Sequence, residues 1–201
     1  MSFAVSLLPS LAQFPRLSAL FGPLQLLGYL ACSISFAAFF AGSQRRFLLV
    51  GATSSMIWVL HYHLLGERLA SALSAISLGR NTIASRVHLT SRPIRVALTL
   101  LVCALVTTLG LRAGSGPITA LPTFAACLST TATFWLVGRA FRRVYLVSDS
   151  CWLLFGLLSG SAAGCVGATV SLGLNLWTIR RQPDARPKCA QSIAHVAAPA
   201  S

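Results

Sequence analysis

A five-residue motif occurs twice in this chain in one fixed register, and this repetition limits what the chain can fold into. Ser77–Asn81 reads Ser-Leu-Gly-Arg-Asn, and Ser171–Asn175, 94 residues downstream, reads Ser-Leu-Gly-Leu-Asn. With that offset fixed and no gap, residues 22–86 align with 116–180, and 20 of the 65 positions are identical. The identities include tryptophan, asparagine, Gly-Pro and flanking arginines, which apolar composition alone would not bring into register. The sequence therefore predicts a duplicated unit with a connecting segment.

Composition places the chain among membrane proteins. Hydrophobic residues make up 55% of the 201 residues and charged residues 9%, whereas a soluble domain carries about 25% charged residues. Apolar runs of about 20 residues, the length that crosses ~30 Å of hydrocarbon, separate short basic clusters. The alternating segments of about ten residues that mark a β-barrel are not seen. We therefore expect an all-α membrane protein whose main partner is the lipid bilayer.

The apolar runs predict seven transmembrane helices, arranged as two parallel three-helix repeats joined by a linker helix. We expect an N-terminal extension at 1–21, a first repeat at 22–86, a connector and linker helix at 87–115, a second repeat at 116–181 and a disordered cytoplasmic tail at 182–201. The seven helices are expected at about 23–41, 46–65, 69–86, 95–113, 117–138, 143–160 and 162–180.

The basic residues divide unequally between the two ends of these helices. With seven spans, 12 of the 16 Lys and Arg residues fall on one side and three on the other, while Arg80 lies within a helix. The richer side is cytoplasmic by the positive-inside rule, which puts the N-terminus outside and the C-terminus inside. Arg139, Arg142 and Arg143 are expected in a cytoplasmic turn. The basic excess then sets topology and does not indicate a nucleic-acid partner.

The linker helix has a geometric reason. Three spans leave the chain on the opposite side of the membrane, so a duplicated three-helix unit would enter upside down. One further span restores the original side, and both units then face the same way. Parallel repeats about an axis along the membrane normal are one of the known transporter plans.

Several short motifs along the chain resemble those of a known family. These motifs are Arg45-Arg46-Phe47, Leu65-Gly66, Ala70-Ser71-Ala72, Cys151-Trp152, Gly160-Ser161 and Gly173-Leu174-Asn175. Together they resemble the YgjV-type bacterial inner-membrane proteins over about residues 22–182. The resemblance implies an inner (plasma) membrane location.

The three-one-three plan also resembles that of SWEET and PQ-loop transporters, in which an asparagine of each third helix faces a central pocket. Asn81 and Asn175 match that pattern in position. The chain has no Pro-Gln dipeptide, and the second and sixth predicted helices lack the prolines with which SWEET-type proteins bend. The resemblance therefore implies a fold and a central site, and it does not imply sugar as the substrate.

Asn81 and Asn175 are the symmetric pair of candidate binding residues. An amide offers two donors and an acceptor with two lone pairs, which suits a small polar solute. The alternative is an interhelical hydrogen bond worth about 0.6 kcal/mol on average. Gly79 and Gly173, two residues earlier, are expected to allow close approach of a neighbouring helix.

Arg80 and Asp149 are the charged residues expected deep within the spans. A charge at the centre of a membrane helix costs about 2.5–3.5 kcal/mol on insertion scales, so such residues face the protein interior and have a partner. The aligned residues are Leu174 for Arg80 and Ser55 for Asp149, so each unit contributes one charge. Three readings stay open: an ion pair between the units, proton exchange at Asp149, or a static structural pair.

Trp58 and Trp152 lie about 12 Å below the outer ends of their helices at ~1.5 Å per residue, too deep for interfacial anchors. Each follows a serine, Ser54 or Ser148, at a spacing of four residues and shares its helix face. We expect either a pocket wall or helix packing. His61 continues the first of these faces and is a weaker candidate for the same wall.

The sequence contains no motif that indicates an enzyme, a metal site or a cofactor. His-Glu-x-x-His, Gly-x-Ser-x-Gly and glycine-rich phosphate loops are absent, and the cysteines form neither a Cys-x-x-Cys pair nor a metal-like spacing with histidine. We expect a carrier or facilitator for a small polar solute, with a central site between the repeats. The competing hypothesis is a non-transporting membrane scaffold or assembly partner, and a homo-oligomer is left open in either case.

Overall fold

The computed structural model describes residues 22–86, 91–114 and 116–181. The predicted extension at 1–21 and tail at 182–201 lie outside these ranges. The described residues form seven α-helices, in agreement with the predicted all-α class. They are α3 (Pro23–Phe39), α4 (Gln44–Leu64), α5 (Arg68–Ala84), α6 (Arg92–Ala113), α7 (Pro117–Trp135), α8 (Gly138–Ser159) and α9 (Ala162–Arg181).

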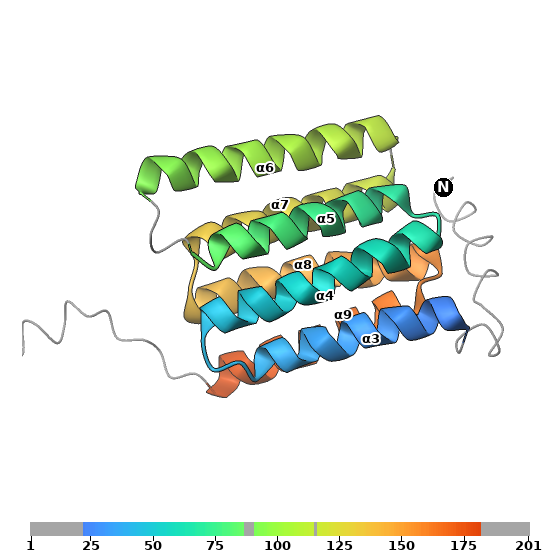
Figure 1. Ribbon diagram of the computed structural model, residues 1–201, viewed down its shortest axis with the longest axis horizontal. Coiled ribbons are helices and arrows are strands. Elements are labelled where there is room, and N and C mark those ends of the chain that lie inside the picture. The colour runs from blue at the N-terminus through green and yellow to red at the C-terminus, as the bar shows by residue number, and fades with distance from the viewer. Residues whose placement is uncertain (1–21, 87–90, 115, 182–201) are drawn as a thin grey trace, which may run out of the picture.

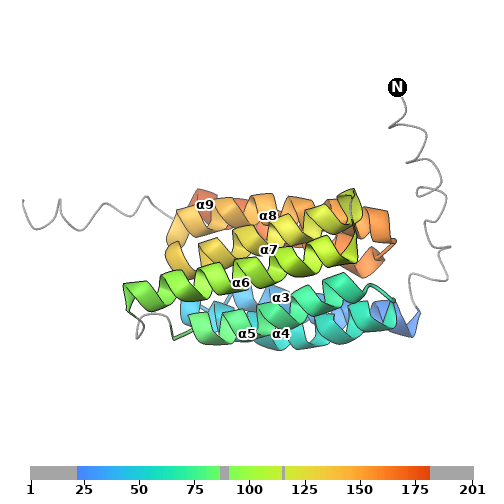
Figure 2. The same cartoon turned by 90° about the horizontal axis from the view of Figure 1, so that it is seen from above.

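The helices form two facing layers. Figure 2 shows α3, α4 and α5 in one layer and α7, α8 and α9 in the other, with α6 along one edge. Between the layers, α3 packs against α9 and α5 packs against α7. Successive helices run in opposite directions, so the connections gather at the two ends of the bundle (Figure 1). One end carries the α3–α4 and α7–α8 connections and the end of α9; we call it the basic end.

Local sequence signals explain most helix boundaries. Pro23 and Pro117 occupy the first turns of α3 and α7, where the missing backbone N–H is not needed. The Ser43 side chain accepts a hydrogen bond from the Arg46 backbone N–H at 3.3 Å and caps α4. Gly160 ends α8 in the left-handed conformation, with φ of 69°, which glycine adopts without steric penalty.

The predicted start of the sixth helix at 143 is wrong. The break in the chain is the extended pair Leu136 and Val137, and α8 begins at Gly138. The arginines predicted in a cytoplasmic turn therefore lie in the first turns of α8. As a result Arg142 belongs to a helix and reaches into the bundle, whereas the sequence predicts it in a turn.

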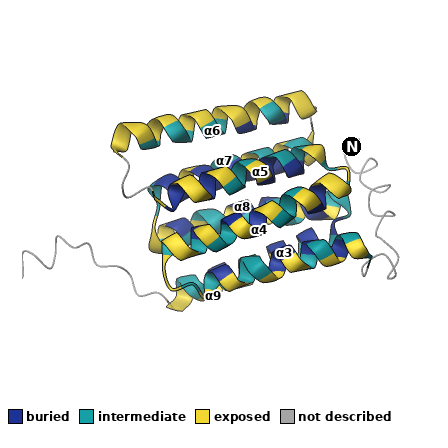
Figure 3. Ribbon diagram, viewed as in Figure 1, coloured by how far each residue is buried: buried dark blue, intermediate teal, exposed yellow. Residues whose placement is uncertain are grey.

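Length and composition support membrane insertion. Within the described residues, three helices are long and apolar enough to cross a membrane, namely α4, α6 and α9, and α3 is a shorter apolar helix. Most of α6 is exposed (Figure 3). Its exposed side chains are largely apolar and include Leu100, Leu101, Leu105 and Leu111, as expected for a surface in contact with lipid.

Glycines allow close helix contact at two positions of α9 and not at two positions predicted from the sequence. A Cβ on Gly164 or Gly167 of α9 would lie 3.3 Å from the Tyr62 hydroxyl or 2.8 Å from the Cys32 sulfur. These glycines therefore permit α9 to approach α3 and α4. The expectation for Gly79 and Gly173 is wrong, since no described atom lies within 4 Å of a Cβ added at either.

Candidate functional site

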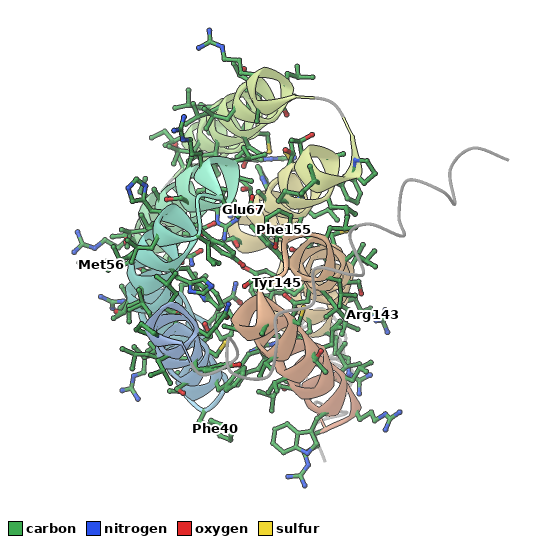
Figure 4. All side chains as sticks on the ribbon, turned by 90° about the vertical axis from the view of Figure 1, so that its right-hand side faces the viewer. Phe40, Met56, Glu67, Arg143, Tyr145 and Phe155 are labelled. Atoms are coloured by element: carbon green, nitrogen blue, oxygen red, sulfur yellow. The ribbon has the colours of Figure 1, made fainter. Side chains whose placement is uncertain are left out.

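A cavity of about 210 Å³ lies between the two layers. Its described wall comes from α3, α4, α5, α7, α8 and α9, and no residue of α6 belongs to it. Figure 4 looks along the bundle and shows Tyr145 and Phe155 pointing into the space between the layers, while Met56 and Arg143 point outward. Seven of the eight predicted site residues line the cavity: Ser54, Trp58, Arg80, Asn81, Ser148, Asp149 and Trp152.

Asn81 and Arg80 form one polar group on the α5 side of the cavity. The Asn81 Oδ1 accepts from the Arg80 Nε at 3.2 Å and from Nη2 at 3.1 Å. The Arg80 Nη1 donates to the Ser129 Oγ at 2.6 Å and to the Thr130 Oγ1 at 3.3 Å, both on α7. Arg80 thus joins the two layers through neutral oxygen acceptors.

Asn175 belongs to a second polar group, behind the cavity wall. It is fully buried and, contrary to the expectation of a symmetric pair, does not line the cavity. Its Nδ2 donates to the Asp149 Oδ2 at 2.9 Å, and its Oδ1 accepts from the Arg142 Nη1 at 3.3 Å. We call Arg142, Asn175 and Asp149 the bridged triad, because the amide connects a guanidinium group to a carboxylate.

The direct pair expected between Arg80 and Asp149 is not formed. Both residues line the same cavity, but Arg80 bonds to α7 and Asp149 bonds to Asn175 on α9. The cation that shares a hydrogen-bond network with Asp149 is Arg142. The sequence does not predict this partner, because its three clustered arginines indicate a turn rather than a helix at Arg142.

Ser54 and Ser148 occupy matching positions and make matching hydrogen bonds. The Ser54 Oγ donates to the Ala31 carbonyl at 2.7 Å, and the Ser148 Oγ donates to the Ala125 carbonyl at 3.1 Å. Both bonds tie the second helix of a unit to the first. The two hydroxyls therefore support the helix pairs as well as the cavity wall.

Stacked aromatic rings bound the cavity toward the end opposite the basic end. Tyr62 stacks on Trp58 with ring centroids 5.3 Å apart and on Trp152 with centroids 6.2 Å apart. The three rings form a continuous stack from α4 to α8, which we call the outer aromatic stack. The two tryptophans are predicted from the sequence and Tyr62 is not, although its spacing of four residues from Trp58 is the helical-neighbour signal.

A second aromatic group lies toward the basic end and encloses Arg142. The Arg142 Cζ lies 4.9 Å from the ring centroid of Phe39, 4.5 Å from that of Phe47 and 5.5 Å from that of Phe141. Such distances correspond to favourable cation–π contact. We call this group the arginine cage. It separates the central cavity from a second cavity of about 260 Å³ at the basic end, and Phe39 and Phe47 contact both.

His61 points inward, as expected of the better-placed histidine, but it lies outside the cavity wall. Its Nδ1 is 2.8 Å from the Leu24 carbonyl oxygen and its Nε2 is 3.2 Å from the Ser161 Oγ. His61 therefore links α4 to α3 and to the α8–α9 connection. In the described part of the chain, no group of three or more His, Cys, Asp or Glu residues is arranged to hold a metal ion.

Comparison with known proteins gives the chain a family. The model for the bacterial inner membrane protein family Imp-YgjV matches residues 24–186. The inner membrane protein YgjV of Escherichia coli is 29% identical over 140 residues, which cover 70% of this chain and 73% of that protein. No solved structure matches the chain. The resemblance inferred from the short motifs is therefore confirmed, and the chain belongs to the YgjV family of bacterial inner membrane proteins.

Proposed function

We propose that this inner membrane protein is a carrier or facilitator for a small polar solute, with its binding site in the central cavity. The observation that carries the proposal is a cavity inside an apolar bundle that exposes polar and charged side chains, with walls from both three-helix layers. Polar and charged groups at membrane depth are expensive, and they mark substrate or ion pathways when they face an interior cavity. Arg80, Asn81 and Asp149 are such groups.

The proposed membrane arrangement has all seven described helices crossing the bilayer, with each layer a unit of one duplication. The hydrogen bonds of Ser54 and Ser148 support the duplication, because donors and acceptors are both 94 residues apart. The contacts of α3 with α9 and of α5 with α7 also support it, since each joins the first helix of one unit to the third helix of the other. In this arrangement the basic end is cytoplasmic.

The two aromatic groups favour a carrier over an open channel. The outer aromatic stack lies on the cavity wall toward one end, and Phe39 and Phe47 of the arginine cage lie on it toward the other. A solute that enters or leaves the cavity along the length of the bundle would pass one of them. We propose that each opens in turn while the other stays closed, as in transporters that rock two repeats around a central site.

Reconstituted vesicles provide the test. The purified protein in proteoliposomes is expected to accumulate one or more solutes from a mixed pool of small metabolites. Gly51 lines the cavity, and a Cβ there would lie 3.4 Å from the Asn81 Nδ2, so Gly51→Leu should fill the cavity and stop uptake. Gly173→Leu is the matched control, because Gly173 is an exposed glycine within a helix with open space around it.

The scaffold hypothesis gives the opposite result in this experiment. It is favoured by the bridged triad, in which polar groups inside the bundle satisfy one another and hold α8 to α9. Folded protein that accumulates nothing from the pool would contradict the carrier, and equal uptake by both glycine variants would contradict the central cavity as its binding site.

A further inference from the structure

The charges around the cavity do not balance. Glu67 and Asp149 are the only carboxylate side chains in the described residues. Glu67 lies in the connection between α4 and α5, and Asp149 is joined to Arg142 through Asn175. Arg80 is therefore left with a buried positive charge and no anionic partner in the part of the chain that the structure describes.

Neutral acceptors occupy most of the Arg80 guanidinium group. Of its five N–H groups, four donate to oxygens of Asn81, Ser129 and Thr130. One N–H on Nη2 is left over. An uncompensated buried charge is strongly unfavourable, and in a membrane interior such a group usually has a partner. A solute in the cavity can supply that partner.

Asn81 contributes unused donors at the same place. Because both Arg80 N–H groups donate to it, the acceptor on this side of the amide must be Oδ1. The Nδ2 is then the other atom, and it makes none of the hydrogen bonds recorded among the described residues. It faces Gly51, where the missing side chain leaves room beside it. The wall thus carries a positive charge and at least two free N–H donors within two consecutive residues.

We infer that the cavity binds a small carboxylate, with Arg80 and Asn81 as the anion-binding residues. This inference rests on the proposed function, since it names the class of solute that the central site would take. A carboxylate has two oxygens that accept hydrogen bonds and a charge that offsets that of Arg80.

The size of the cavity limits the rest of the solute. A cavity of about 150 Å³ holds benzene, which has six heavy atoms, and this cavity measures about 210 Å³. The rings of Trp58 and Trp152 and the hydroxyl groups of Ser54 and Ser148 form other parts of the wall. A short-chain hydroxy acid matches this combination of an anion site, hydroxyl groups and apolar rings.

Lactate and lactamide form a matched pair of probes, because they have the same shape and differ in the carboxylate. The full chain, purified in detergent, is titrated with sodium lactate, lactamide or sodium chloride while its Tm is measured. Lactate is expected to raise the Tm with concentration, as a ligand of the folded state does, while lactamide and chloride leave it unchanged. No shift with lactate, or an equal shift with lactamide or chloride, would overturn the inference.

Two substitutions place the binding at the α5 wall. Arg80→Gln is expected to weaken lactate binding at least tenfold, whereas Arg112→Gln, at an exposed position on α6, should leave it unchanged. Asn81→Asp gives Arg80 an internal counter-charge. This variant should fold with a Tm at or above that of the wild type and lose the response to lactate. A full lactate response in folded Asn81→Asp protein would overturn the assignment even if Arg80→Gln fails to fold.

The binding result and the transport result are separable. Uptake of an uncharged solute by vesicles, with no lactate response in the Tm, would remove the carboxylate assignment and leave the carrier. Lactate binding that Arg80→Gln and Asn81→Asp abolish, in protein that accumulates no solute, would support the carboxylate site and remove the carrier.

Discussion

Asn81 and Asn175 occupy the same position of a repeated motif, and their surroundings differ. Asn175 uses both its donor and its acceptor on charged partners and is fully buried. Asn81 uses its acceptor on Arg80 and lines the cavity. Asn175 therefore has its donor and acceptor paired within the protein, whereas Asn81 has only its acceptor paired. Neighbouring residues, rather than the asparagine itself, therefore decide which amide keeps unpaired donors at the cavity.

The difference comes from a few substitutions between the units. Arg142 and Asp149 align with Leu48 and Ser55 in the first unit. Leu48 is buried in an apolar cluster with Ala84 and Phe134, and the Ser55 Oγ donates to the Gly51 carbonyl of its own helix. The first unit thus has no equivalent of the bridged triad, and its third helix carries Arg80 instead.

Asn81 and Asn175 are equivalent only if both units face the same way in the membrane. A topology measurement can contradict that arrangement. A reporter that is active only in the cytoplasm should be active when fused after Arg181 and silent when inserted at Ser115, because the basic end is expected inside. A reporter inserted after Ser43, in the α3–α4 connection, should be active and serves as the control. Activity at both Ser43 and Ser115 with silence after Arg181 would mean that the two units face opposite ways, and activity at Ser115 alone would reverse the orientation of the whole chain.

Thiol accessibility tests which asparagine faces the cavity. In a variant without the six native cysteines, Asn81→Cys should react with a small polar methanethiosulfonate reagent, while Asn175→Cys should not. The reason is that Asn81 lines the cavity and Asn175 is fully buried behind it. Both proteins are checked for folding by their elution from a sizing column. Equal labelling at both positions would restore the symmetric pocket that the sequence predicts.

Removal of each amide should have unequal effects on stability. Asn175→Leu leaves the half-buried Arg142 and Asp149 without their bridge; breaking a fully buried charge network costs about 3–5 kcal/mol, which is the upper end of the expected loss. Asn81→Leu removes one acceptor from Arg80 and should cost about 1–3 kcal/mol. Unfolding in detergent measures both, and a larger loss for Asn81→Leu would contradict the proposed division of roles.

The sequence predicts most of this fold because its boundary signals are local. Gly22-Pro23, Gly66 and the glycines around Pro117 mark helix ends, and the structure places the ends within a few residues of the predicted positions. The start of α8 is the exception. Three arginines within five residues are typical of a membrane-surface loop, but cation–π contacts and the Asn175 amide hold Arg142 inside the bundle.

The sequence predicts which residues belong to the candidate site better than it predicts their hydrogen-bond partners. The repeat register and helical spacing identify residues that share a helix face. They predict that Ser54 and Trp58, and their aligned counterparts, lie together. Hydrogen bonds between helices depend on rotation and separation, which a single sequence does not contain. Arg80 and Asp149 are opposite in charge and similar in depth, yet each has a nearer polar partner on another helix.

The smallest expected effect is the coupling energy between charged residues, which shows which charges interact. Arg142→Leu and Asp149→Ser each copy the first unit, and each alone leaves a buried group of the triad without its counterpart. The double variant should recover part of the lost stability, with a coupling energy of about 0.5–3 kcal/mol, as for residues in one network.

Arg80→Leu copies the second unit, and in combination with Asp149→Ser its effect should be additive within about 0.5 kcal/mol. Thermal or denaturant unfolding of the singles and doubles in detergent measures both cycles. Strong coupling in the Arg80 cycle and none in the Arg142 cycle would mean that the charges pair across the cavity. The open site at Asn81 would then lose the unpaired cation on which it depends.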